Sequence, residues 1–263
     1  MRVINADDGE RVSAADRGLT YGDGCFETMR IADGGIPLLD WHAARLEKSI
    51  HQLQLTNVSA SNVLDHVLGL VAKQSPRDWA KLILTRGRGG RGYAAKDVDG
   101  PTLILSTGLL TPIRQGMTVT LATDAATAQP VLAGLKHLSR LSEVMAANRC
   151  PQDADEQLML DHQSSVISGV MHNIHIVREG QLLTPDLGVF GVAGVMRDWL
   201  LGHTEVLVQR VTIEDILLAD EVLFSNGLRG IRNATSVCGH RLRAETPIGD
   251  KLRKGLQAAG FPQ

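Results

Sequence analysis

Aromatic residues make up only 3% of this 263-residue chain, although 43% of its residues are hydrophobic. The buried core must therefore be mainly aliphatic, and few rings are available to stack on nucleic-acid bases. The formal net charge is −2, which gives no overall attraction to nucleic acid or to an anionic membrane. We therefore expect no nucleic-acid partner, and any bound anion must be held by a local group of residues.

Cysteine is also rare. The three cysteines, Cys25, Cys150 and Cys238, lie far apart in the sequence, which indicates neither a disulfide framework nor the paired ligands of a zinc site. No apolar run reaches the roughly 20 residues of a membrane-spanning helix, and residues 1–9 lack the apolar segment of a secretory signal. These absences predict a cytoplasmic protein with no membrane association and no bound metal.

The chain is long enough for two modest domains. Hydrophobic periodicity predicts strands at 2–5, 25–32, 80–85, 102–106, 117–122, 156–161, 170–177, 205–211 and 221–225, and helices at 39–53, 62–73, 141–149, 191–201, 213–218 and 248–259. Asp33-Gly34-Gly35 has the composition of a hairpin turn. Because these elements follow no regular βαβ rhythm, we predict two α+β domains, 1–108 and 117–263, joined by a linker at 109–116.

Lysine is scarce, with seven lysines among the 27 basic residues, and Lys136 differs from the other six. Its neighbours are glycine and leucine, in the segment Gly134-Leu135-Lys136-His137-Leu138. An ammonium group in apolar surroundings loses hydration, so its pKa falls and a nucleophilic neutral amine becomes available. Such an amine suits a Schiff base with a carbonyl cofactor. The alternative is a partly buried lysine whose amine reaches water.

Three segments could bind an anion. Gly191–Arg197 places glycines at the start of the predicted helix 191–201, where free N–H groups and the positive end of the helix dipole suit a phosphate. A second glycine turn lies at Ser225–Ile231, and Arg45 lies on the predicted helix 39–53. Glycine-rich helix starts and surface arginines are common, so each segment alone also fits a purely structural role.

A loop rich in glycine and arginine spans residues 86–93 and ends in Arg91-Gly92-Tyr93. Its guanidinium groups suit a small molecule that carries carboxylates. A solvated loop is the alternative, and nucleic-acid binding is a poor fit for a slightly acidic chain with few aromatics. No Walker lysine, nucleophile elbow or strand-linked dinucleotide motif is present.

In chain order, these pieces resemble the fold-type IV pyridoxal-phosphate enzymes, which include branched-chain and D-amino acid aminotransferases. The resemblance is carried by residues 16–28, 42–46, 86–93, 134–141, 154–156, 184–185, 194–197 and 219–222. Within this class, the Gly-Gly-Arg-Gly-Tyr loop and the Lys-His-Leu frame most resemble the aminodeoxychorismate lyase family. That family would convert 4-amino-4-deoxychorismate to 4-aminobenzoate and pyruvate, a step of folate biosynthesis.

The resemblance implies a role for individual residues. Lys136 would form the Schiff base with pyridoxal 5'-phosphate, and Thr28 would be a second catalytic position. Arg91 and Tyr93 would bind the substrate carboxylates. The remaining implied cofactor contacts are Arg45, Ser168, Asn173, Gly194, Val195, Met196, Gly227 and Leu228. The resemblance also implies a homodimer.

Ser168 departs from the family pattern. The family places a glutamate there, five residues before the asparagine that is Asn173 here. A carboxylate would keep the pyridine nitrogen protonated, and a serine hydroxyl cannot supply that charge. Two alternatives to the lyase therefore remain open: a D-amino acid or branched-chain aminotransferase, and a catalytically weak relative that binds the cofactor or serves as a structural partner.

Overall fold

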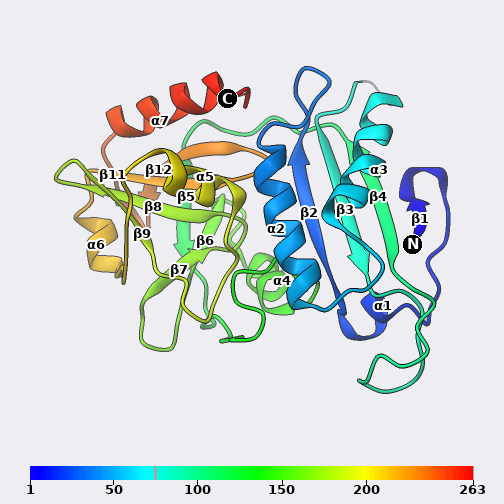
Figure 1. Ribbon diagram of the computed structural model, residues 1–263. Coiled ribbons are helices and arrows are strands. Elements are labelled where there is room, and N and C mark those ends of the chain that lie inside the picture. The colour runs from blue at the N-terminus through cyan, green and yellow to red at the C-terminus, as the bar shows by residue number, and fades with distance from the viewer. Residues whose placement is uncertain (74–75, 263) are drawn as a thin grey trace. The chain divides into compact units, whose positions relative to one another are not determined.

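The computed structural model describes residues 1–73 and 76–262 of the chain. It forms two compact units (Figure 1). The first consists of Met1–Thr111 together with Leu135–Ser139, and the second of Pro112–Gly134 together with the chain from Arg140 onward. Lys136 thus belongs to a short segment that packs with the first unit. Both units mix helices and strands, which confirms the α+β prediction.

The first unit is a four-stranded sheet covered by helices. Its strand order is β1-β4-β3-β2, and only β1 and β4 run parallel. The strands are β1 (Arg2–Asn5), β2 (Gly24–Arg30), β3 (Trp79–Thr85) and β4 (Thr102–Gly108). Helices α2 (Leu39–Gln52) and α3 (Ala60–Lys73) pack on one face of the sheet in an aliphatic core, and η1 (Ala6–Asp8) and α1 (Arg17–Tyr21) are short.

Strand β2 shows how alternation places its side chains. Successive residues of a strand face opposite sides, so Cys25 and Met29 join the core under α2 and α3. Phe26 and Thr28 are half-buried on the other face. Because β2 is the last strand of its sheet, its outer edge is free to pair with another segment.

The second unit is built on a nine-stranded sheet of order β10-β9-β8-β11-β12-β5-β6-β7, with β13 paired to β12. Its strands are β5 (Met117–Leu121), β6 (Glu156–Leu160), β7 (Val166–Gly169), β8 (Asn173–Arg178), β9 (Gln181–Pro185), β10 (Leu207–Gln209), β11 (Glu221–Asn226), β12 (Gly230–Val237) and β13 (His240–Arg241). Its helices are α4 (Leu141–Asn148), α5 (Val195–His203), α6 (Ile213–Leu217) and α7 (Pro247–Ala258). Among the described residues, no helix has the length and apolar character needed to cross a bilayer.

The predicted strand at 170–177 is wrong in its first half. Residues 170–172 form a turn between β7 and β8. The buried carboxylate of Glu156 accepts the N–H groups of Val170 and Met171, at 3.0 and 3.1 Å, and stabilises this turn. Sequence periodicity could not reveal that bond, and it also missed α1, β7, β9, β12 and β13.

Two glycine-containing segments also differ from prediction. The turn at Asp33-Gly34-Gly35 closes an isolated bridge between Ala32 and Gly35, but β2 then pairs with β3 and not with the segment after the turn. Helix α5 begins at Val195, four residues later than predicted, because Gly191–Gly194 remains extended or turned.

Candidate active site

Lys136 is held against the free edge of β2 by backbone hydrogen bonds. Its carbonyl accepts the N–H of Phe26 at 2.9 Å, and the N–H of Leu138 donates to Gly24 O at 3.0 Å. The pairing fixes the chain on both sides of Lys136. The half-buried lysine extends over the Phe26 ring, with Nζ 4.3 Å from the ring centroid.

A second lysine lies at the same ring. Lys81 of β3 has its Nζ 5.3 Å from the Phe26 centroid and pairs in register with Thr28. Phe26, Thr28, Lys81 and Lys136 therefore gather on the sheet face that α2 and α3 do not cover.

On the opposite face, Glu27 is 1% exposed and receives two side chains from α2. Arg45 donates from Nε to Oε1 at 2.7 Å and from Nη2 to Oε2 at 2.5 Å. His42 Nδ1 lies 2.7 Å from Glu27 Oε2. Because His42 and Arg45 are three residues apart, they share one side of the helix.

The charge balance of this group follows from its burial. Burial alone would raise the pKa of Glu27, but the charge of Arg45 and the hydrogen bonds from His42 and Arg45 outweigh it and lower the pKa to about 2. Burial lowers the pKa of His42, and the charges of Arg45 and Lys136 act in the same direction. Glu27 is therefore ionised and His42 neutral at pH 7. Among the described residues, His42 Nε2 has no hydrogen-bond partner.

In the second unit, the start of α5 offers buried N–H groups. Gly194 is the N-cap, and no side chain of the described residues caps the helix through a hydrogen bond. The first helical residues, Val195 and Met196, are 1% and 0% exposed. The N–H groups of a first turn have no partner within their own helix and carry the positive end of the dipole, so this helix start suits a phosphate.

Asn173 fastens the loop that leads into this helix. Its Nδ2 donates to Val192 O at 3.0 Å. A Cβ atom on Gly194 would lie 2.0 Å from Asn173 Oδ1, so any other residue would force Asn173 or the loop to shift. The same loop bonds to Gly134, two residues ahead of Lys136 in the chain, through Ala193 N–H at 3.0 Å. Asn173 thus holds the loop that precedes the helix start, and the cofactor contact that the resemblance implies for it stays a prediction.

Gly227 and Leu228 lie in the turn between β11 and β12. The N–H groups of Leu228 and Arg229 donate to Asn226 Oδ1 at 3.0 and 2.7 Å. This turn is therefore stabilised by its own asparagine. Ser225, which precedes it, pairs in register with Asn173, so the turn begins beside the residue that holds the α5 loop.

Ser168 is 9% exposed on β7 and pairs with Met159 of β6. The nearby carboxylate of Glu156 is already engaged, since it accepts backbone N–H groups and lies 2.5 Å from His172 Nδ1. Among residues 1–73 and 76–262, no three His, Cys, Asp or Glu side chains are grouped so that they could hold a metal ion.

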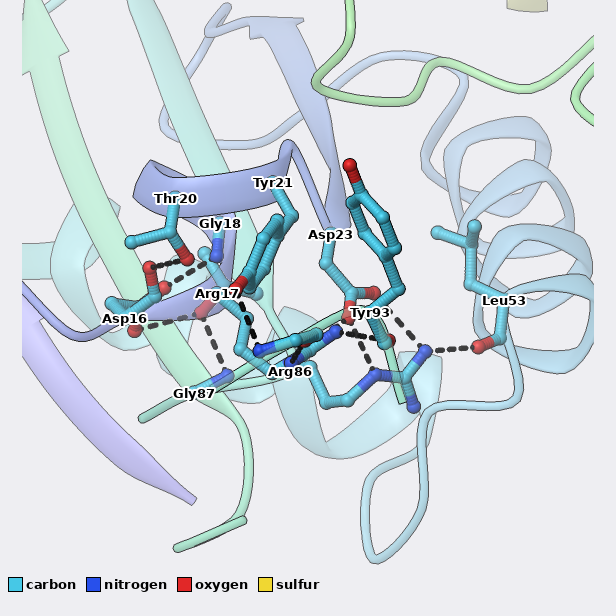
Figure 2. Close-up of polar contacts among 12 residues, drawn as sticks. Asp16, Arg17, Gly18, Thr20, Tyr21, Asp23, Leu53, Arg86, Gly87 and Tyr93 are labelled. Carbon is cyan, nitrogen blue, oxygen red and sulfur yellow. Dashed lines mark hydrogen bonds and ion pairs between the residues drawn. The ribbon is translucent and has the colours of Figure 1, made fainter. Parts of the chain in front are cut away.

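Arg91 and Tyr93 are both exposed near the end of the loop 86–93, and Figure 2 shows Tyr93 beside Tyr21. Tyr93 is 90% exposed. Within the described part of the chain, the Arg91 side chain makes no hydrogen bond or ion pair. Each of the predicted roles at Arg91, Tyr93 and the other site residues stays a prediction.

Sequence reasoning missed four residues that surround the predicted ones: Phe26, Glu27, His42 and Lys81. A signal for His42 was present, because His42 and Arg45 occupy the buried face of an amphipathic helix, where polar groups need a partner such as Glu27. Phe26 and Lys81 gave no signal of their own. They lie near Lys136 only because its segment pairs with β2, which is more than 100 residues away in the sequence.

Comparison with known proteins identifies the family of the chain. The model of the amino-transferase class IV family matches residues 24–237. The aminodeoxychorismate lyase of Vibrio harveyi is 32% identical over 257 residues, 94% of each chain, and the D-alanine aminotransferase of Bacillus licheniformis is 24% identical over 256 residues, 94% of this chain and 90% of its own. The crystal structure of 4-amino-4-deoxychorismate lyase from Pseudomonas aeruginosa has a TM-score of 0.88 and 35% identity, with 95% of each chain covered. The chain belongs to the class IV aminotransferase family.

Proposed function

We propose that this protein is a lyase that converts 4-amino-4-deoxychorismate to 4-aminobenzoate and pyruvate, with pyridoxal 5'-phosphate as its cofactor. The fixed position of Lys136 on β2 is the observation that carries the proposal. The similarity of the chain to the aminodeoxychorismate lyases of Vibrio harveyi and Pseudomonas aeruginosa supports the choice of substrate.

The residues present fit this cofactor. The uncapped, buried start of α5 suits its phosphate, with Val195 and Met196 supplying N–H groups. The charge of Arg45 is balanced by Glu27, so its contact with the phosphate stays a prediction, and Lys136 would supply the amine for covalent attachment. When bound, the cofactor's pyridine ring withdraws electrons from the substrate carbon next to the attached nitrogen.

Lys136 would also transfer a proton within the substrate, from its ring to its enolpyruvyl group. Its Nζ would take the hydrogen from the ring carbon that bears the substrate nitrogen, and return it to the methylene carbon of the departing enolpyruvyl group. The bond between the ring and the enolpyruvyl oxygen breaks as the ring becomes aromatic, and the released fragment is pyruvate.

Ser168 favours a lyase over an aminotransferase. Amino transfer needs strong electron withdrawal, which a protonated pyridine nitrogen provides, and serine cannot maintain that proton as a carboxylate does. Aromatisation is strongly downhill, so the lyase reaction demands less of the ring. An aminotransferase remains the second candidate because a D-alanine aminotransferase is among the relatives.

The proposal extends to assembly and location. Helix α4 exposes Leu141, Val144 and Met145, at 70%, 50% and 42%. Apolar side chains exposed side by side suit an interface, which supports a homodimer. Cys25, Cys150 and Cys238 are unpaired, which supports a reducing cytoplasm.

A coupled assay tests the function. The protein loaded with pyridoxal phosphate would be combined with an aminodeoxychorismate synthase, and 4-aminobenzoate would be measured by fluorescence. We expect product from the wild type and a loss of several orders of magnitude in Lys136→Ala. A yellow protein that transfers amino groups to 2-oxo acids, but forms no 4-aminobenzoate, would favour the aminotransferase instead.

A further inference from the structure

One buried arginine, Arg17, forms hydrogen bonds with the backbone of the loop that contains Arg91. Arg17 is 3% exposed, and its guanidinium donates from Nη1 to Gly92 O at 3.0 Å and from Nη2 to Tyr93 O at 2.7 Å (Figure 2). The two accepting carbonyls directly follow Arg91. Charge-assisted bonds from a planar fork fix geometry as well as supply energy, so the backbone beside Arg91 is held in one place.

The arginine is itself held by a shared carboxylate. Asp23 accepts from Arg17 Nε at 2.9 Å and from Arg86 Nε at 2.8 Å. Arg86 in turn donates to Leu53 O at 2.6 Å. Burial opposes the ionisation of Asp23, but the hydrogen bonds and charges of Arg86 and Arg17 outweigh it and lower its pKa. The loop is thereby tied to the end of α2 through ionised groups.

Tyr21 adds a third attachment. Its hydroxyl accepts the N–H of Gly92 at 3.1 Å. Its ring lies 4.7 Å from Arg17 Cζ and 5.7 Å from the Tyr93 ring, edge to face. Gly92, the residue after Arg91, is therefore bound through both its N–H and its C=O, although it lies in a loop with four glycines (Gly87, Gly89, Gly90 and Gly92).

We propose that Arg17, with Asp23 and Tyr21, is a positioning residue for substrate binding, and that it acts through Arg91. This inference rests on the proposed function, in which Arg91 binds a carboxylate of the substrate. A glycine-rich loop left free would lose conformational entropy on binding. The hydrogen bonds from Arg17 already order the backbone of the loop in the folded protein. Binding of the substrate to Arg91 would therefore cost less conformational entropy.

The test measures affinity for chorismate, the analogue in which a hydroxyl replaces the amine of the substrate. Isothermal titration of the cofactor-loaded protein needs no turnover. Arg91→Ala removes the direct contact, Arg17→Lys keeps the charge but loses the fork, and Tyr21→Phe is a milder variant in case Arg17→Lys unfolds. Arg88→Lys is the matched control, because the exposed side chain of Arg88, in the same loop, forms a surface ion pair with Asp99.

We expect Arg17→Lys to weaken chorismate binding about 10- to 100-fold, Tyr21→Phe to weaken it less, and Arg88→Lys to leave it within about twofold. In an Arg91→Ala background, Arg17→Lys should have no further effect. In turnover, KM should rise while kcat stays nearly constant. Unchanged affinity in Arg17→Lys, or a full effect that persists without Arg91, would overturn the inference. If Arg91→Ala alone leaves chorismate binding intact, the carboxylate role of the loop in the proposed function fails instead.

Discussion

Replacing the buried carboxylate of Glu27 should lower the free energy of unfolding by an amount that can be worked out from the structure. Glu27→Gln keeps the shape of the side chain but removes the charge that Arg45 and His42 face. The pKa of Glu27 falls from an ordinary value of 4.5 to about 2, which corresponds to about 3 kcal/mol of stability at about 1.4 kcal/mol per unit. Removing one partner of a buried ion pair typically costs about 3–5 kcal/mol. We therefore expect Glu27→Gln to lose about 3 kcal/mol at pH 7.

The dependence on pH has a definite sign. Because the folded state lowers the pKa of Glu27, its stabilisation is fully present above pH 4.5 and is lost as the pH falls through about 2. Urea unfolding followed by circular dichroism, at pH 7 and at steps down to pH 3, would measure it. The difference between wild type and Glu27→Gln should narrow toward acid. Glu10→Gln is the control, since Glu10 lies exposed.

A Glu27→Gln protein within 1 kcal/mol of the wild type at pH 7 would refute this reasoning. A difference that stayed constant from pH 7 to pH 3 would do the same, because it would show that the charge of Glu27 is not the source of the loss.

Three further predictions concern the cofactor. Arg45→Ala should weaken pyridoxal phosphate binding about 10- to 150-fold, the worth of a charge-assisted contact, in a titration followed by visible absorbance; unchanged affinity would leave Arg45 as a partner of Glu27 only. Ser168→Glu should shift the cofactor spectrum toward the protonated ring and raise amino transfer more than lyase activity, once the folded fraction is matched; a well-folded variant with no change in either would place Ser168 away from the ring nitrogen. Gly194→Ala would place Cβ 2.0 Å from Asn173 Oδ1, so it should weaken cofactor binding and lower the free energy of unfolding by about 1–3 kcal/mol. Gly69→Ala is the control: its Cβ meets open space in α3, so it should raise the free energy of unfolding by about 0.4–1 kcal/mol.

Local patterns predicted the parts of the site that depend on local chemistry. The glycine and leucine residues on either side of Lys136 distinguished it from the other lysines. Helical spacing predicted α2 to within one residue at its C-terminal end. The glycines before α5 predicted a helix start with free N–H groups, but they placed it four residues early, because glycine also favours the loop that Asn173 holds.

Contacts between distant segments could not be predicted in this way. No periodicity in the sequence indicates that Lys136 pairs with Phe26, or that Arg17 reaches the carbonyls of Gly92 and Tyr93. Strand β7 was missed because four buried residues that include a serine and a glycine carry too weak a pattern. These gaps share a cause: tertiary hydrogen bonds override local preference where the chain departs from simple alternation.

The most direct test of the central claim is the ratio of products in one incubation. Purified 4-amino-4-deoxychorismate would be added to the cofactor-loaded protein without any 2-oxo acid, and 4-aminobenzoate and pyruvate would be quantified together. The lyase account predicts equal molar amounts of the two, both absent with Lys136→Ala. Consumption of substrate without 4-aminobenzoate, or turnover only after a 2-oxo acid is added, would contradict it.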